Sequence, residues 1–262
     1  MKNKSKKIVK FVLYIIIILY ISYWAIYYCV LHYYPLPYSK FENIEYSNYI
    51  FNADGKLIRL ELNIKDSWIL PVKLNEISPL FINATIAIED KNFYHHNGVD
   101  FRAIIRAIFQ NIYNKKIISG ASTITMQVVG LIEPLKKTIP HKIIQLVHAV
   151  KLEKLYSKEK ILKLYFEIAP YGGNIYGIKA ASLRYFKKMP DKLNLSESAL
   201  LAGLPQSPTR FRPDRYPNMA KTRRDMVFLR MLNDKYISIN DYEQFIDTPI
   251  AAGCFSLSSN YP

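Results

Sequence analysis

The chain has 262 residues and half of them are apolar, which favours one anchored domain with a sizeable core and excludes extensive disorder. Its formal net charge is +15. The first ten residues hold five lysines and no acid, so the body alone carries a charge of +10. A basic body predicts an anionic partner, and phospholipid, nucleic acid and a phosphorylated substrate are all compatible with the charge.

The first predicted element is a membrane-spanning helix over Phe11–Leu31, residues 11–31, preceded by a basic tail at residues 1–10. The run is uncharged, about as long as a bilayer requires, and too long for the apolar region of a cleaved signal peptide. Aromatic residues gather at its far end, as in an interfacial belt. The preceding lysines place the N-terminus in the cytoplasm and the body outside it. This weakens the case for nucleic acid and favours phospholipid or a lipid-linked phosphate as the anionic partner. A buried core helix is the alternative interpretation.

Residues 32–80 are predicted to form a connector with some strand. Two prolines directly after the apolar run end the membrane helix. The short runs Tyr49–Phe51 and Leu57–Leu62 flank the turn-like sequence Asn52–Gly55, a pattern typical of a hairpin.

Helical patterns then dominate a predicted domain over residues 81–240, and residues 241–262 lose the pattern and are expected to form a tail. Asp100, Ser157 and Ser196 are placed as N-caps. The predicted helices cover Phe81–Glu89, Asp100–Tyr113, Ser122–Ile132, Lys142–Tyr156, Lys158–Ile168, Ile178–Phe186, Ser196–Gly203 and Ala220–Asn233. Apolar residues at helical spacing are expected in the core at Ile143, Leu146, Val147, Val150 and Leu155.

The first candidate site is the end of the helix that closes on Glu89 and Asp90, followed by a loop rich in His and Asn. Acidic residues at a helix C-terminus oppose the helix dipole. Their unfavourable position indicates a function, because it would raise the proton affinity of a carboxylate as a general base requires. An exposed helix end with solvated acids is the alternative.

The second candidate site is the run Gly120–Gln127, which places Ser122, two threonines and a glutamine at the start of a helix. Hydroxyl groups and free backbone N–H groups there suit an anion, although an ordinary helix cap has the same pattern. A cationic stretch follows it at Lys136, Lys137, His141 and Lys142, with Arg102 and Arg106 upstream. Beside an anion-binding helix start, these cations could hold a diphosphate, whereas on their own they would form a solvated surface.

These motifs together resemble glycosyltransferase family 51 over roughly residues 80–232. The family pattern E-D-x-x-F-x-x-H-x-G-x-D is matched by Glu89, Asp90, Phe93, His96, Gly98 and Asp100. The pattern G-x-S-T-I-T-x-Q is matched by Gly120, Ser122, Thr123, Ile124, Thr125 and Gln127. The block Leu152–Tyr165 resembles a third family motif.

Three later segments make the chain similar to one branch of the family, and they are Ala169–Asn174, Leu204–Pro208 and Arg212–Arg215. That branch normally continues into a transpeptidase domain, for which no room is left before Pro262. We therefore expect a glycosyltransferase domain alone. The S-x-x-K string from Ser157 to Lys160 lacks the other penicillin-binding elements and is interpreted as a chance match.

The resemblance implies a lysozyme-like, mainly α fold that polymerises lipid II into β-1,4 glycan at the bacterial plasma membrane, with the catalytic domain outside. It makes Glu89 the general base for the acceptor hydroxyl and assigns the lipid diphosphate to cations and polar groups. The substrate-binding residues that it implies are Asp90, Phe93, His96, Ser122, Thr123, Thr125, Gln127, Lys137, Lys142 and Gln145. Implied partners are lipid II, the growing glycan-lipid diphosphate, the membrane and a cell-wall synthesis complex.

The chain departs from the family pattern at Gly130, where a Lys or Arg is usual, at Gln145, where a second Glu is usual, and at Glu167, where Asn is usual. Loss of the cation at Gly130 is expected to cost a few kcal/mol of leaving-group stabilisation, with Lys136 or Lys137 as a replacement. A slow enzyme is the resulting prediction. The alternatives are an inactive module that binds lipid II or the cell-wall machinery, and a lytic enzyme that cleaves glycan.

No cofactor is predicted with ligands of its own. The two cysteines, Cys29 and Cys254, do not form a disulfide scaffold, and no metal-ligand spacing is present. By resemblance alone, a divalent cation (Mg²⁺ or Mn²⁺) assists some members of the family.

Overall fold

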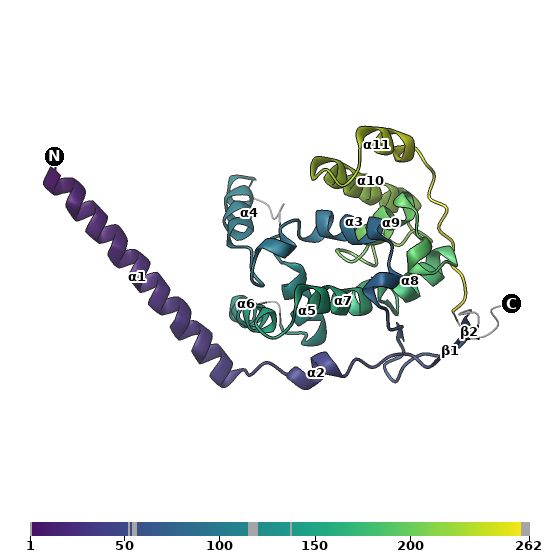
Figure 1. The fold of residues 1–262 in the computed structure, drawn as a ribbon, viewed down its shortest axis with the longest axis horizontal. Coiled ribbons are helices and arrows are strands. Elements are labelled where there is room, and N and C mark those ends of the chain that lie inside the picture. The colour runs from purple at the N-terminus through teal and green to yellow at the C-terminus, as the bar shows by residue number, and fades with distance from the viewer. Residues whose placement is uncertain (1, 52, 54–56, 115–119, 137, 258–262) are drawn as a thin grey trace.

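A computed structural model of the chain describes residues 2–51, 53, 57–114, 120–136 and 138–257 (Figure 1). This part is mainly α with a few short strands, and one long helix stands apart from the body, which confirms the predicted class. The helices are α1 (Lys2–Tyr33), α2 (Tyr38–Glu42), α3 (Pro79–Glu89), α4 (Phe101–Asn114), α5 (Ile124–Ile132), α6 (Ile139–Glu153), α7 (Lys158–Ile168), α8 (Ile178–Phe186), α9 (Leu195–Gly203), α10 (Pro217–Asn233) and α11 (Ile239–Ile246). The strands are β1 (Tyr49–Phe51), β2 (Leu57–Leu60), β3 (Trp68–Ile69), β4 (Pro170–Gly172) and β5 (Ile175–Tyr176).

Helix α1 contains the predicted apolar run, and its stretch Lys10–Tyr33 is long and apolar enough to cross a membrane. Most of its large side chains are exposed. Only its C-terminal part packs on the body, against α6, where Tyr27 is buried and the ammonium of Lys154 lies 4.8 Å from the centre of the Tyr27 ring. An apolar helix without protein neighbours along most of its length is suited to a lipid environment.

Strands β1 and β2 pair antiparallel, so the predicted hairpin is confirmed, while its turn falls largely outside the described residues. A second small sheet has the order β3-β5-β4, in which β3 is parallel to β5 and β4 is antiparallel to β5. The pairing of β3 with β5 joins the segment before α3 to the body.

The core of the body lies between two groups of helices, with α3 packed on α9 and α10, and α5 packed on α6 and α7. Phe81 of α3 and Phe166 of α7 are both fully buried with ring centres 5.2 Å apart, which links the two groups. Helix α3 begins with a proline, which suits the first turn because no intrahelical partner is needed for its nitrogen. Its C-terminus, with Glu89, is directed toward the start of α5.

Two of the three predicted N-caps are confirmed. The Asp100 carboxylate accepts a hydrogen bond from the Ala103 amide, and the Ser157 hydroxyl accepts one from the Lys160 amide. Ser196 is wrong as a cap, because Asn194 caps α9 through a reciprocal pair of hydrogen bonds with Glu197. The Ser196 hydroxyl instead forms hydrogen bonds with residues that are distant in the sequence.

Helix α6 differs from the prediction because it starts at Ile139, with Pro140 in its first turn, and ends at Glu153. Leu155 therefore lies beyond the helix and is 44% exposed, so its expected place in the core is wrong. The other four apolar residues on this stretch line a cavity of about 220 Å³ shared with α1. These apolar residues of α6 therefore face α1 as well as the interior of the body.

The segment expected as a C-terminal tail contains helix α11. Ser238 caps it by accepting from the Asp241 amide, and the Asp241 carboxylate accepts from the Ser238 backbone in return. The helix is only eight residues long, so periodicity alone was too weak to reveal it.

Candidate functional site

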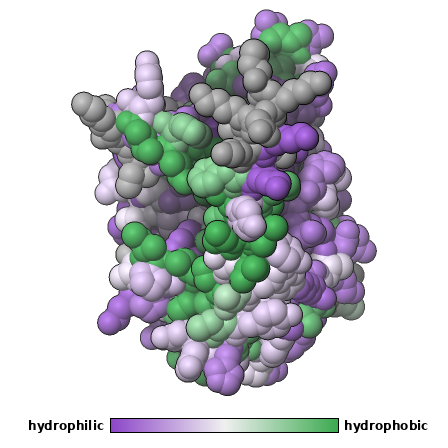
Figure 2. Space-filling view, turned by 90° about the vertical axis from the view of Figure 1, so that its left-hand side faces the viewer, coloured by the Kyte–Doolittle hydropathy of each residue, from purple (hydrophilic) through white to green (hydrophobic). Residues whose placement is uncertain are grey.

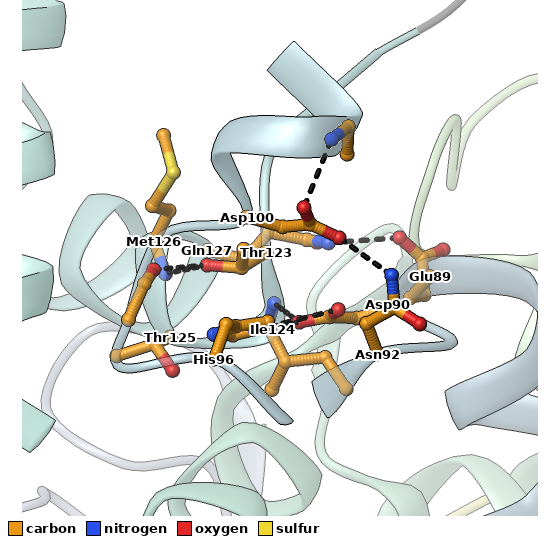
Figure 3. Close-up of polar contacts among 12 residues, drawn as sticks. Glu89, Asp90, Asn92, His96, Asp100, Thr123, Ile124, Thr125, Met126 and Gln127 are labelled. Atoms are coloured by element: carbon orange, nitrogen blue, oxygen red, sulfur yellow. Dashed lines mark hydrogen bonds and ion pairs between the residues drawn. The ribbon is translucent and has the colours of Figure 1, made fainter. Parts of the chain in front are cut away.

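Glu89 is the last residue of α3, and its side chain is 9% exposed. Its Oε2 accepts a hydrogen bond of 2.8 Å from Gln127 Nε2 of α5 (Figure 3). Its Oε1 is buried and has no hydrogen-bond partner among the described residues, and the nearest cation is Arg223 of α10, whose Nη2 lies 4.0 Å away. One carboxylate oxygen is thus held by a hydrogen bond, and the other is enclosed without one.

The surroundings of Glu89 favour its protonated form. Burial raises the pKa of the Glu89 carboxyl group, and the hydrogen bond from Gln127 and the charge of Arg223 oppose the shift without cancelling it. The negative charge of Asp90 raises the pKa further. A carboxylate with raised proton affinity and a free oxygen is able to take a proton from a hydroxyl group placed against it.

Asp90 caps the end of α3 and ties the following loop to α5. Its carboxylate accepts hydrogen bonds of 2.9 Å from His96 Nε2 and from the Ile124 amide (Figure 3). Both Asp90 and His96 are buried, with side chains 4% and 7% exposed. These two residues therefore set the position of Glu89 relative to the start of α5.

The N-terminus of α5 is fastened to the same loop through Thr123. The Thr123 hydroxyl donates to the Gly98 carbonyl at 2.6 Å and accepts from the Met126 amide at 3.1 Å. Gly98 has φ +88°, and a Cβ there would lie 2.6 Å from the carbonyl oxygen of Ala149 in α6. The family motif needs glycine here because the loop runs against the backbone of α6 in a left-handed conformation.

Thr125 and Phe93 also belong to this frame, and both are fully buried. The Thr125 hydroxyl donates to Glu153 at 2.5 Å, and Lys158 Nζ donates to the same carboxylate at 2.7 Å. The Lys158 ammonium also donates to the His96 carbonyl at 2.6 Å and lies 4.5 Å from the centre of the Phe93 ring. The sequence analysis placed Glu153 and Lys158 in a motif but missed this role, which depends on contacts between distant segments.

A cavity of about 600 Å³ is lined in part by Gln127. Lys142 Nζ lies at its edge and donates hydrogen bonds to Ser122 Oγ at 2.8 Å and to Gln145 Oε1 at 2.9 Å. The lining residues are Gln127, Gly130, Leu131, Glu133, Leu135, Lys136, Thr138, Ile139, His141, Lys142 and Gln145. Because Lys136, His141 and Lys142 are basic and Glu133 is the one acid in the lining, the cavity suits an anion.

The predicted site residues fall into two groups. Those that form the buried frame are Asp90, Phe93, His96, Thr123 and Thr125. Those at Glu89 or the cavity are Gln127, Ser122, Lys142 and Gln145. Lys137 lies outside the described residues, and Arg102 and Arg106 are on the exposed surface of α4, away from the cavity lining.

Arg223 is the residue at this site that the sequence analysis missed. It is 7% exposed, and its Nε donates to the Gly203 carbonyl at 3.0 Å, which holds the guanidinium beside Glu89. The one signal in the sequence was an Arg-Arg pair inside an otherwise amphipathic helix, and the neighbouring Arg224 is also fully buried. The packing of α10 on α3 and α9 determines which of these two arginines lies beside Glu89.

The donor set does not fit a divalent cation held by protein ligands. Among the described residues, no three His, Cys, Asp or Glu side chains lie close enough to share an ion. Asp90 and Asp100 are occupied by hydrogen bonds from His96, the Ile124 amide, Asn92 and the Ala103 amide. The reaction that we propose for this site uses no such ion.

A family model described as Transglycosylase matches residues 55–232. The match covers more than half of the chain, so the chain belongs to the Transglycosylase family. The three family motifs that begin at Glu89, Gly120 and Leu152 all lie inside the matched range.

The relatives that match include penicillin-binding proteins of the 1C and 1A types. The chain is 41% identical to penicillin-binding protein 1C of Escherichia coli (strain K12) over 197 residues, which are 75% of this chain and 25% of that protein. It is 39% identical to penicillin-binding protein 1A of Aquifex aeolicus (strain VF5) over 180 residues, 68% of this chain and 25% of that protein. The resemblance noted from the later sequence segments is to the 1C type, and this similarity confirms it.

A solved structure, that of penicillin-binding protein 1A from Haemophilus influenzae, matches with a TM-score of 0.48 and 25% identity, over 82% of this chain and 22% of that one. The chain spans about a quarter of the length of the curated relatives it matches.

Proposed function

We propose that this protein is a peptidoglycan glycosyltransferase that polymerises lipid II into β-1,4 glycan with release of undecaprenyl diphosphate. One observation carries the proposal: Gln127 hydrogen-bonds the Glu89 carboxylate and also lines the basic cavity. Gln127 thus adjoins both the candidate base, Glu89, and the candidate anion site, which is the basic cavity. Transfer from a lipid diphosphate donor requires a general base beside an anion site. A chain of the Transglycosylase family with this arrangement has both.

In the proposed reaction, Glu89 takes the proton from the 4-hydroxyl of the acceptor sugar. The oxygen forms a bond to the anomeric carbon of the donor, and the bond from that carbon to the diphosphate oxygen breaks with inversion. The diphosphate leaves with the bonding electron pair. Lys142, Lys136 and the Ser122 hydroxyl stabilise its growing charge, so the reaction needs no second carboxylic acid as proton donor.

Lys136 lies in the lining of the same cavity as Gly130. It therefore supplies the cation that the family usually carries at the position of Gly130. This supports a working, if slower, enzyme over a module that only binds. The proposed direct contacts with substrate are made by Ser122, Gln127 and Lys142. Gln145 acts by positioning Lys142, and the buried frame residues act by holding Glu89 and α5 in place.

The surface around α4 supports work at a membrane. Helix α4 turns the small residues Ala103 and Ala107 inward and a row of large apolar residues outward. The exposed row consists of Phe101, Ile105, Ile108, Phe109, Ile112 and Tyr113. Helices α1 and α4 lie on the same side of the molecule in Figure 1, and Figure 2, which looks onto that side, shows hydrophobic residues gathered there. Contact with acyl chains would remove this apolar surface from water.

We further propose a single pass through the bacterial plasma membrane, with the lysine-rich N-terminus in the cytoplasm and the body outside. This placement sets the basic cavity against the leaflet in which the diphosphate head group of lipid II lies. Lipid II, the growing glycan chain and the cell-wall synthesis machinery are the proposed partners.

Incubation of the purified full-length protein with labelled lipid II in detergent tests the proposal. Polymeric product that is lost in Glu89→Gln, by at least about a hundredfold as expected for a missing general base, supports it. Binding of lipid II without product would instead identify a binding module. Shortening of preformed glycan strands would identify a lytic enzyme.

A further inference from the structure

The ammonium of Lys142 is held by neutral oxygen atoms. Its two hydrogen-bond acceptors are the Ser122 hydroxyl and the Gln145 amide oxygen, at 2.8 and 2.9 Å. No carboxylate forms an ion pair with it among the described residues. Burial lowers the pKa of Lys142, so an anion in the cavity would compensate a charge that no described carboxylate neutralises.

Gln145 uses both ends of its amide. The oxygen accepts from Lys142, and Nε2 donates to the Met126 carbonyl of α5 at 2.6 Å. A glutamine can make both bonds at once because it carries a donor and an acceptor, whereas a glutamate could accept from Lys142 but would repel the carbonyl. The amide therefore connects α6 to the start of α5 and fixes where the Lys142 charge sits.

Gly130 provides the space that this arrangement needs. A Cβ at residue 130 would lie 2.5 Å from Gln145 Nε2, far inside van der Waals contact. Only the end of the Gln145 side chain is in the way, so a larger residue would displace the amide rather than disrupt the helix. The two departures from the family pattern, Gly130 and Gln145, are thus in direct contact with each other.

We infer that Gly130 and Gln145 form one coupled device that positions Lys142 for a lipid diphosphate while leaving its charge uncompensated. This rests on the proposed function of the cavity. Gln145 is a positioning residue that acts through Lys142, and Gly130 acts through Gln145. A carboxylate at 145 would neutralise the cation by pairing with it, and the neutral amide keeps the full charge for the leaving group.

Two double-mutant cycles test this order of action, with lipid II turnover and binding of undecaprenyl diphosphate in detergent micelles as readouts. We expect Gln145→Ala and Gly130→Ala each to raise Kd and to lower kcat/KM by about tenfold, the effect of one lost charged hydrogen bond, with Tm nearly unchanged. In the double variant Gly130→Ala with Gln145→Ala, the alanine at 130 should add less than about twofold. In a Lys142→Ala background, Gln145→Ala should likewise add almost nothing.

Gln145→Glu provides a second probe, because it keeps the shape and changes the charge. It should weaken binding at least as much as Gln145→Ala. Gln244→Ala, which changes an exposed glutamine on α11, is the matched control and should leave KM and Kd unaffected.

Additive effects in either cycle, or a loss of Tm without a change in Kd, would overturn the inference while leaving the proposed function intact. If the wild-type protein binds undecaprenyl diphosphate but makes no polymer, the polymerase proposal fails and the cycles are decided on Kd alone. If it binds neither lipid, both proposals fail together.

Discussion

Glu89 occupies a position where its ionised form is disfavoured. It is nearly enclosed, it ends a helix whose dipole opposes a negative charge, and Asp90 adds a like charge next to it. Gln127 and Arg223 offset part of this cost by contacting opposite oxygens of the carboxylate. These surroundings raise the pKa of Glu89 and so its proton affinity, as a general base requires.

Replacing Glu89 by glutamine should stabilise the protein at neutral pH. The pKa of Glu89 is raised in the folded state, so its contribution to stability is fully present below its unfolded pKa, near 4.3, and is lost as pH rises through the folded pKa. Glutamine cannot ionise and avoids this loss. Thermal melts should show a higher Tm for Glu89→Gln than for wild type at pH 7.5, and the gap should close toward pH 4. A gap of equal size at both pH values would contradict the buried, ionised carboxylate.

Arg223 should set the pH at which activity begins. Transfer needs ionised Glu89, so the rate rises with pH through the pKa of that group. Removing the nearby positive charge in Arg223→Gln raises this pKa, which should move the acid limb of kcat/KM to higher pH by about one unit. Arg223→Lys keeps a charge and should leave the limb nearer its original position. An unchanged limb in Arg223→Gln, with only a lower plateau, would assign Arg223 to packing alone.

At the scale of elements, the start of α5 is the point at which the segments of the site are connected. Thr123 caps the helix and also bonds the Gly98 carbonyl, while Asp90 bonds the Ile124 amide, so the loop after α3 and the N-terminus of α5 move as one unit. Gln127, one turn further on, then meets both Glu89 and the cavity. The sequence pattern revealed the helix start, and the tertiary contacts explain why it needs a threonine.

Thr123→Ala should lower the free energy of unfolding by about 2 kcal/mol, because the helix loses its cap and a buried carbonyl loses its donor. Thr123→Ser keeps the hydroxyl and should recover most of this difference. Urea denaturation of the three proteins, followed by circular dichroism, measures both values. Equal losses in the alanine and serine variants would mean that the methyl group, and not the two hydrogen bonds, is what matters.

At the scale of the whole molecule, α1 and α4 define one side. Most of α1 is exposed apolar surface, and α4 adds its outward row of large side chains on that side. The basic cavity and Glu89 lie in the body behind them. This distribution of apolar surface supports the proposed orientation of the site toward a membrane, independently of any single residue.

A polarity-sensitive fluorophore should report this orientation. Attached at Ile112→Cys in α4, with Cys29 and Cys254 replaced by serine, it should shift to the blue and be quenched by brominated lipid after reconstitution into vesicles. The matched control is Ile239→Cys on α11, which is also exposed but on another side of the body. Its fluorophore should remain in water and escape quenching. Equal quenching at both positions would show that α4 does not enter the bilayer.

How much of the fold and of the site could be predicted from the sequence depends on how far apart along the chain the interacting residues lie. Helix α1, the hairpin of β1 and β2, and the caps at Asp100 and Ser157 depend on neighbours a few residues away, and the sequence predicted them. Ser196 and Leu155 were wrong because neighbouring caps and helix ends compete within two or three residues. Helix α11 was missed because a short element depends on the surface it packs against.

The sequence by itself determined the helical class, the apolar N-terminal helix, the motifs that place the chain in its family, and Glu89 as the carboxylate to examine. Those features are local patterns of spacing and charge. Only the tertiary structure decided that Arg223 flanks Glu89, that Asp90 and Thr123 belong to a buried frame, and that Gly130 and Gln145 touch. Each of these brings together segments far apart along the chain, and their meeting depends on how whole helices pack, which no local pattern encodes.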